Sequence, residues 1–535
     1  MKPNDNFVAF LGFAPDADPT TPGVLTDTTM MISGVRGLAS FPLGTRLDGP
    51  TGLATNANFS IYPQGVAETM WVGLDPDSAT TMGIVVKTRK DLTNRLYALR
   101  SLTTNTSAVV YGQWQDVAPT SVSMVNGPYT FARMGGTLLF CGGYTSGTSG
   151  TPKQKLSSLN WDASVQVTAA PFASIVVVAN RFTMVLNYNT TAAGHAPGVG
   201  FTDGWYCAGR DNFTDWTASV STLCAYGRLV ESDGQLTAGL AFGDDILAFK
   251  QNSFYLGRFV PDNAEVWVWE KVSSSAGARN QMCVCNDREG RAYMLALDDL
   301  YVWDGAQVKG LMGGKVREWY VANFYNVDIT TSPVRTLPSI FYDSLREAII
   351  VCGQASGDSG NYVLSLCLRT GIWAKAFTQY DFVCAGGGIR IASSVNISWP
   401  NYSTPYGLKS STTFSYNDSS ANRYLFDLNS QATAGGQVCG FTTGDYGSDF
   451  FESEVKALRA RDIAGNSLVQ SNRRARAYHR PALTDALSAS SWVTAKADGA
   501  FDIRQSDKWH RFAFEYSGHA EVTGVNIDVT RQGAK

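Results

Sequence analysis

The sequence predicts an all-β fold, an irregular β-propeller of roughly six or seven blades with inserted loops and a β-rich C-terminal part. Short apolar and aromatic runs alternate with tight polar turns through most of the chain. An aromatic strand that ends near a turn recurs at uneven intervals of about 40 to about 70 residues. The chain has 52 glycines and 12% aromatic but only 17% charged residues, as expected for many short strands. The alternative is a sandwich or stacked barrels, because the number of strands does not determine how the sheets close.

The clearest blade-like pattern lies between Leu240 and Gly305. Here apolar runs flank polar turns, as in Ile246–Phe249 and Phe254–Phe259, and again in Arg291–Leu297 and Leu300–Trp303. Asp, Asn and Gly are typical of hairpin turns because they tolerate the left-handed conformation or bond to their own backbone. No segment here has the length and period of a helix. We therefore expect two consecutive four-stranded units.

The chain divides into three parts. Residues 1–55 are rich in Pro, Gly, Asp and Thr and predict an ordered N-terminal arm that lies over another part of the protein. Residues 56–430 predict the propeller with its loop insertions, among them a longer irregular section, Asn187–Ser221. Residues 431–535 predict a β-rich region that is either a propeller closure or an appendage. Gly435-Gly436 and Gly440–Gly447 predict a flexible entry to this region.

The net charge is −3, which weighs against tight binding of nucleic acid but not against a duct through which DNA passes. Nine scattered cysteines and four histidines lack the spacing of a metal site, so we expect buried reduced thiols, no metal and no cofactor. The N-terminus has no apolar signal segment, and no run approaches the length of a membrane span. We expect synthesis in the cytoplasm.

Two aspartate pairs are the candidates for catalysis. Asp244-Asp245 and Asp298-Asp299 could act as paired carboxylates in acid–base chemistry, as in glycoside hydrolases. The favoured interpretation is that both are hairpin corners, because they occupy the same place in successive units. The sequence has no nucleophile elbow, no phosphate-binding loop and no Gly-rich turn that opens a helix. We therefore expect no catalytic residues and no enzyme.

A basic run could face a partner or a lumen. It consists of Arg473, Arg474, Arg476 and Arg480. The favoured alternative is a solvated strand face or ion pairs between subunits. Six tryptophans could stack on sugars but are more often blade core or subunit contacts; they are Trp205, Trp216, Trp267, Trp269, Trp303 and Trp319.

Residues 240–320 resemble a known family. They contain FKQNSFYLGRF, VWVWEKV, the pair Gly277-Ala278, LDDLYVWDG and VKGLMGGKVREWY in this order. This order is similar to that of the nozzle or hub proteins of short-tailed bacteriophages, also called tail tubular B or packaged-DNA stabilisation proteins. The start GFAPDADPTTPGVLTD and the C-terminal DGAFDIRQSDKWHRFAFEYSG fit the same pattern. The match spans most of the chain but contains no catalytic signature.

The resemblance implies a structural virion protein. Such propeller-based protomers assemble as a homo-oligomeric ring, usually a hexamer, and form the distal tail tube. The ring retains packaged double-stranded DNA without sequence-specific binding and opens for ejection. Its partners are the tail adaptor and the tail fibre or spike proteins. A carbohydrate- or receptor-binding propeller module is the alternative, and a propeller hydrolase is a third hypothesis.

Overall fold

The computed structural model describes residues 7–41, 45–46, 66–74, 82–90, 93–100, 103–105, 108–110, 113–118, 124–143, 153–160, 163–189, 200–261, 266–324, 338–343, 346–356, 361–378, 406–410, 423–427, 438–465 and 472–532. These residues are mainly β-strand, with one α-helix, α1 (Arg317–Asn323), and one short 3-10 helix, η1 (Gln281–Cys283). No helix among them is long and apolar enough to cross a membrane.

Four-stranded antiparallel units follow one another along the chain and form the blades. Blade 1 contains β7 (Val66–Leu74), β8 (Met82–Lys90), β9 (Thr93–Arg100) and β12 (Gln113–Asp116), with the inserted hairpin β10 (Thr103–Asn105) and β11 (Ala108–Val110). Blade 2 contains β13 (Tyr129–Met134), β14 (Thr137–Gly142), β15 (Gln154–Asn160) and β16 (Ala163–Gln166). Blade 3 contains β17 (Phe172–Ala179), β18 (Phe182–Asn189), β19 (Gly200–Cys207) and β20 (Ala225–Arg228), and β17 also pairs with β15.

The later blades are separate sheets. Blade 4 contains β21 (Leu236–Phe242), β22 (Asp245–Lys250), β23 (Phe254–Phe259) and β24 (Trp267–Ser273). Blade 5 contains β25 (Val284–Asn286), β26 (Ala292–Leu295), β27 (Leu300–Trp303) and β28 (Val308–Gly310). Blade 6 contains β29 (Ser339–Asp343), β30 (Ala348–Gln354), β31 (Asn361–Cys367) and β32 (Trp373–Thr378).

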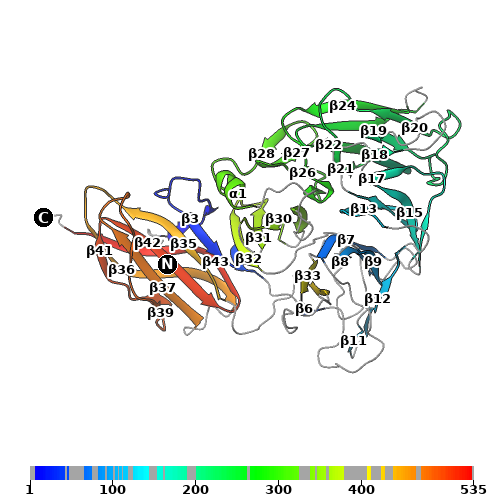
Figure 1. Cartoon of the computed structure of the whole chain (residues 1–535). Helices are drawn as coiled ribbons and strands as arrows, with labels where there is room; N and C mark the ends of the chain where they lie inside the picture. The colour runs from blue at the N-terminus through cyan, green and yellow to red at the C-terminus, as the bar shows by residue number, and fades with distance from the viewer. Residues whose placement is uncertain are drawn as a thin grey trace.

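A three-stranded sheet joins the two ends of this series. β33 (Tyr406–Ser410) and β34 (Arg423–Asp427) follow blade 6 in the sequence, and β34 pairs with β6 (Thr45–Arg46), which precedes blade 1. The blades follow an arc, and this sheet falls between its two ends in the view of Figure 1. The predicted all-β fold, an irregular propeller of roughly six or seven blades, is confirmed.

The stretch from Leu240 to Gly305 folds as expected, into parts of blades 4 and 5. Because neighbouring blades cover both of its faces, β22 is almost wholly buried, which explains its continuous apolar run. Gly277 follows blade 4, and a Cβ there would lie 2.2 Å from the Lys250 carbonyl oxygen. Only glycine therefore lets the chain pass this close to the blade.

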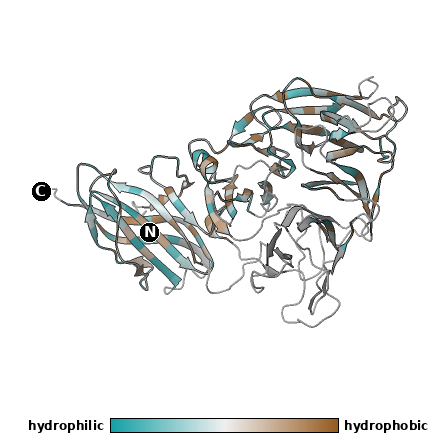
Figure 2. Cartoon of the chain, viewed as in Figure 1, coloured by the Kyte–Doolittle hydropathy of each residue, from teal (hydrophilic) through white to brown (hydrophobic). Residues whose placement is uncertain are grey.

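Both ends of the chain build a second unit, a β-sandwich. One sheet contains β1 (Phe7–Ala9), β4 (Met31–Gly34), β5 (Gly37–Ser40), β36 (Ser453–Gly465), β40 (Ala500–Phe501), β41 (Gln505–Asp507) and β43 (Ala520–Arg531). The other contains β2 (Gly12–Phe13), β3 (Val24–Thr29), β35 (Val438–Gly447), β37 (Arg473–Arg480), β38 (Ser488–Ala489), β39 (Val493–Thr494) and β42 (Trp509–Ser517). Apolar and polar residues alternate along these strands (Figure 2), and Leu25, Leu458 and Phe514 belong to one shared core.

In the described part of the chain, the N-terminal and C-terminal segments therefore fold together as one unit. The strands of the N-terminal arm pair with β35 and β43, and no described strand after residue 437 pairs with a blade strand. The arm also packs on blade 6. The Ser33 N–H donates to Ser365 Oγ over 2.8 Å, and the Lys375 N–H donates to Thr28 Oγ1 over 2.7 Å. The arm thus joins the sandwich to the propeller.

Two sequence-based expectations about loops are wrong. Gly440–Gly447 lies in strand β35, because Gly440 and Gly444 allow the chain to approach other backbone segments closely; a Cβ at Gly440 would lie 2.3 Å from the Phe514 carbonyl oxygen. The expected irregular section Asn187–Ser221 contains β19, where Gly204 leaves room for the Tyr188 and Phe201 side chains.

Candidate functional site

The predicted basic run forms β37, whose side chains alternate between the two faces of its sheet. The sequence Arg-Arg-Ala-Arg-Ala-Tyr-His-Arg places Ala475 and Ala477 in the sandwich core, where small side chains fit. Arg473 is also buried. Arg474, Arg476 and Arg480 share the opposite, outer face. The structure therefore divides the predicted patch, and we call this outer surface of β37 and β42 the arginine face.

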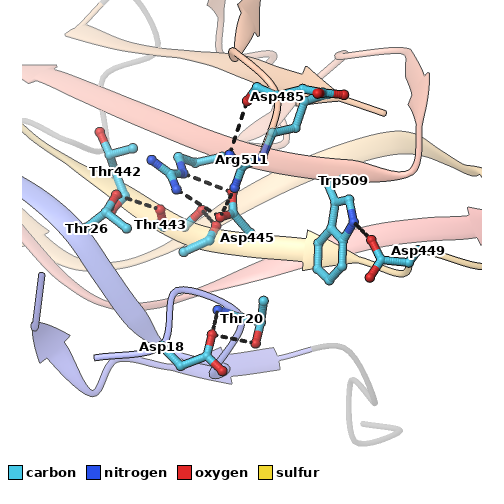
Figure 3. Close-up of polar contacts among 12 residues, drawn as sticks. Asp18, Thr20, Thr26, Thr442, Thr443, Asp445, Asp449, Asp485, Trp509 and Arg511 are labelled. Atoms are coloured by element: carbon cyan, nitrogen blue, oxygen red, sulfur yellow. Dashed lines mark hydrogen bonds and ion pairs between the residues drawn. The ribbon is translucent and has the colours of Figure 1, made fainter. Parts of the chain in front are cut away.

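At one end of the arginine face, two arginines share one buried carboxylate. The Asp445 carboxylate accepts hydrogen bonds from Arg480 over 2.6 Å and from Arg511 over 2.9 and 3.0 Å, as Figure 3 shows for Arg511. The Asp445 side chain is only 1% exposed. This carboxylate holds both arginines in place and compensates one of their two positive charges.

The other end of the arginine face is aromatic. The guanidinium groups of Arg474 and Arg476 lie 4.7 and 4.5 Å from the centre of the Trp492 ring. Arg476 also lies 4.6 Å from the Tyr478 ring. Arg474 bonds to Glu515 over 2.7 Å, but among the described residues the buried Arg476 Nε has no hydrogen-bond partner. Cation–π contacts hold Arg476 in position while its charge lacks a carboxylate partner there.

A second exposed feature lies at the end of the sandwich, between β35 and β36. The side chains of Phe450 and Phe451 are 85% and 50% exposed, and Asp449 and Glu452 flank them and are also exposed. Asp449 Oδ1 accepts a hydrogen bond from Trp509 Nε1 over 2.7 Å (Figure 3), which ties this turn to β42. We call residues 449–452 the tip. Exposed apolar side chains beside carboxylates are typical of a contact surface.

Both aspartate pairs lie at hairpin corners, as predicted. Asp244 and Asp245 join β21 to β22, and Asp298 and Asp299 join β26 to β27. Asp298 forms an ion pair with Arg317. Asp299 is buried and accepts hydrogen bonds from the N–H groups of Leu311 and Met312 over 3.2 and 2.9 Å. Burial raises the pKa of Asp299 while these amide groups oppose the shift, so this carboxylate anchors the chain that leads into α1.

Two lysines are buried between blades without a carboxylate as a hydrogen-bond partner. Lys153 Nζ donates to the Asn187 and Asn189 side-chain oxygens over 2.6 and 3.0 Å, and Lys250 Nζ donates to the carbonyl oxygens of Leu229 and Ser232. Burial lowers the pKa of Lys153 to about 8. These ammonium groups connect strands of neighbouring units and so serve the packing of the propeller.

The other candidates from the sequence belong to the interior. Of the six tryptophans, Trp205, Trp216, Trp267 and Trp303 are buried in blade cores. The eight described cysteines are free thiols, and burial raises the pKa of those at Cys141 and Cys283 to about 12. No group of three or more His, Cys, Asp or Glu in the described part of the chain is arranged to hold a metal ion.

Sequence reasoning missed several residues of the arginine face and the tip. Trp492, Arg511 and Asp445 come from separate strands and loops, so only the strand pairing β35-β42-β37 brings them beside the predicted arginines. The adjacent residues Phe450 and Phe451 could have been recognised in the sequence, because two phenylalanines between acidic residues indicate an exposed apolar contact surface.

The chain matches no protein-family model, and no curated protein sequence is similar to it. It is similar in structure to the β-propeller domain of the Trilobed protease from Pyrococcus furiosus, with 9% identity, a TM-score of 0.32, and coverage of 69% of this chain and 97% of that one. It is also similar to AztD from Citrobacter koseri, with 11% identity, a TM-score of 0.30, and coverage of 70% and 96%.

A GH43 glycoside hydrolase is a third similar structure, with 10% identity, a TM-score of 0.23, and coverage of 75% of this chain and 97% of that one. At these identities and TM-scores, such likenesses carry no argument about activity. The assignment to the β-propellers rests on the blades described above.

Proposed function

We propose that this chain is a structural virion protein that forms the distal tail tube, or nozzle, of a short-tailed phage. In this role it assembles as a ring, retains packaged DNA and opens for ejection. Its partners are the tail adaptor, the tail fibre or spike proteins, and the DNA that passes through the lumen. The sequence resemblance over residues 240–320 supports the proposal.

The main support for the proposal is that the polar side chains fall into two groups, one that stabilises turns and one that is exposed on the sandwich. The carboxylates that suggested catalysis support backbone turns, and Asp299 is buried beneath two amide groups. The arginine face and the tip, both on the sandwich, are accessible to a partner. Arginine, tryptophan and exposed phenylalanine are typical of protein contacts, which suits an assembly component better than a small-molecule site.

Electron microscopy of the purified protein in negative stain tests this proposal. We expect closed rings with a central channel, which bind to the adaptor protein of the same virion when the two are mixed. A protein that stays monomeric at all concentrations and does not bind the other virion proteins would contradict the proposal.

A carbohydrate- or receptor-binding module is the second candidate, and Trp492 is the observation that favours it. The indole lies beside the guanidinium groups of Arg474 and Arg476, and Arg476 also contacts the Tyr478 ring, so the surface offers aromatic rings that can stack on a sugar. A glycan array distinguishes the two roles. Reproducible binding that is lost in Trp492→Ala would favour the binding module, whereas the nozzle role predicts no glycan signal.

A further inference from the structure

The arginine face has an excess of positive charge. Arg474, Arg476, Arg480 and Arg511 contribute four guanidinium groups, whereas Asp445 and Glu515 contribute the two carboxylates paired with them. One of the two surplus charges belongs to the pair Arg480 and Arg511, which share Asp445, and the other to Arg476, which contacts two aromatic rings. Since a guanidinium on an aromatic platform is held in place, it can bind a carboxylate with little further loss of freedom.

The tip has the complementary chemistry. Phe450 is the most exposed phenylalanine of the described chain and offers an apolar group, while Asp449 and Glu452 offer carboxylates on either side. The turn is braced at both ends. Asp449 is tied to Trp509, and the Gln532 N–H donates to the Glu452 carbonyl oxygen over 2.9 Å. A braced turn presents Phe450 in a defined position, which favours binding.

The tip and the aromatic end of the arginine face lie at opposite ends of the same sheet. Arg480 pairs with Trp509 beside the tip, whereas Arg474 pairs with Glu515 at the other end of β42. At about 3.3 Å per residue, the six residue steps from Arg474 to Arg480 span roughly 20 Å. Within one copy of the chain, the tip therefore does not contact the aromatic end of the arginine face.

We infer that the tip of one copy of this chain docks on the Arg474–Arg476–Trp492 surface of the next copy. Phe450 packs against Trp492, and the carboxylates of Asp449 and Glu452 face Arg476. The inference rests on the proposed ring and assigns the contact that builds it. Two different surfaces meet, so the contact is heterologous, and repetition of such a contact closes into a ring when the rotation permits.

A mixing experiment tests this contact directly. Phe450→Ser removes the apolar group of the tip, and Arg476→Glu reverses the charge of the face. Arg504→Glu is the matched control, because Arg504 is an exposed arginine of the same sandwich outside both surfaces. Sedimentation velocity measures the mass of each variant, and circular dichroism checks that each has folded.

We expect Phe450→Ser and Arg476→Glu each to sediment as monomers where the wild type and Arg504→Glu form rings. Their equimolar mixture should give a species of twice the monomer mass, because one variant keeps a working face and the other a working tip. Rings from either folded variant, or a mixture without dimers, would overturn the inference. Wild-type rings that tolerate both substitutions contradict only this contact, whereas a monomeric wild type contradicts the proposed nozzle as well.

Discussion

Three buried charged side chains of the propeller and two outer arginines of the sandwich have different surroundings. In the propeller, Lys153, Lys250 and Asp299 are buried and bonded to backbone groups or neutral side chains. In the sandwich, Arg474 and Arg476 lie on an outer face beside Trp492. Charges of the first kind hold strands together, whereas those of the second kind are accessible to a partner. The comparison suggests that the propeller is the scaffold and the sandwich is the contact surface.

The largest expected effect is on a buried charge cluster of the sandwich, Asp445 with Arg480 and Arg511. Asp445→Ala leaves Arg480 and Arg511 without their carboxylate, which should lower the free energy of unfolding of the sandwich by about 3–5 kcal/mol. Urea titration followed by tryptophan fluorescence measures it. Asp445→Asn keeps an acceptor oxygen and should lose less. A loss below about 1 kcal/mol would show that solvent compensates both arginines.

The matching change in the propeller is Asp299→Ala. The Met312 N–H loses its acceptor, whereas the Leu311 N–H keeps the Leu300 carbonyl oxygen at 2.9 Å, so the propeller should lose about 1–3 kcal/mol. Asp244→Ala is the control at the equivalent corner of blade 4, where the exposed carboxylate should matter by no more than about 0.5 kcal/mol. Equal losses in the two variants would refute the view that Asp299 is an internal anchor.

The buried lysines predict a pH dependence of the propeller. The pKa of Lys153 is lowered from 10.5 to about 8 by burial, so between these values the unfolded chain binds more protons than the folded chain. Stability due to this group therefore rises as pH increases from about 8 towards 10.5, and below about 8 its cost is complete. Lys153→Met should flatten this part of the curve. Melting temperatures that stay parallel for the two proteins across this range would contradict the prediction.

The smallest expected effect concerns the joint between the two units. The Asp16 carboxylate accepts hydrogen bonds from the N–H groups of Glu318 and Trp319 over 2.7 and 3.1 Å, and so caps α1 from the N-terminal arm. Asp16→Ala should cost about 0.5–2 kcal/mol in the melting transition of the propeller. Asp18→Ala, which removes contacts within its own turn to Thr20, should change that transition less. A larger loss in Asp18→Ala than in Asp16→Ala would contradict the role of Asp16 in joining the two units.

The sequence predicted the blades better than the sandwich for a physical reason. A blade is made of consecutive strands, so the hairpin signals around Asp244-Asp245 and Asp298-Asp299 lie within a short window of sequence. The sandwich pairs β3 with β35 and β1 with β43, across more than 400 residues, and no local pattern specifies such partners. The N-terminal arm was recognised as ordered, but its role as part of two sheets was not.

The candidate surface was predicted in part. Four arginines were named, and alternation along β37 separates the buried Arg473 from the outer three. Their partners could not be predicted, because Asp445 and Trp492 reach them only through strand pairing and a loop. The glycines of Gly440–Gly447 led to the wrong prediction of a loop. In a crowded sheet, glycine also occurs where two backbone segments approach closely.

One measurement tests the central claim that assembly depends on the sandwich and not on the propeller surface. It compares the sedimentation mass of Arg476→Glu with that of Arg258→Glu, which reverses an exposed arginine on β23 of blade 4. The account predicts that Arg476→Glu falls to the monomer mass while Arg258→Glu keeps the mass of the wild-type ring. A full-mass ring in Arg476→Glu, or a monomer in Arg258→Glu, would contradict it.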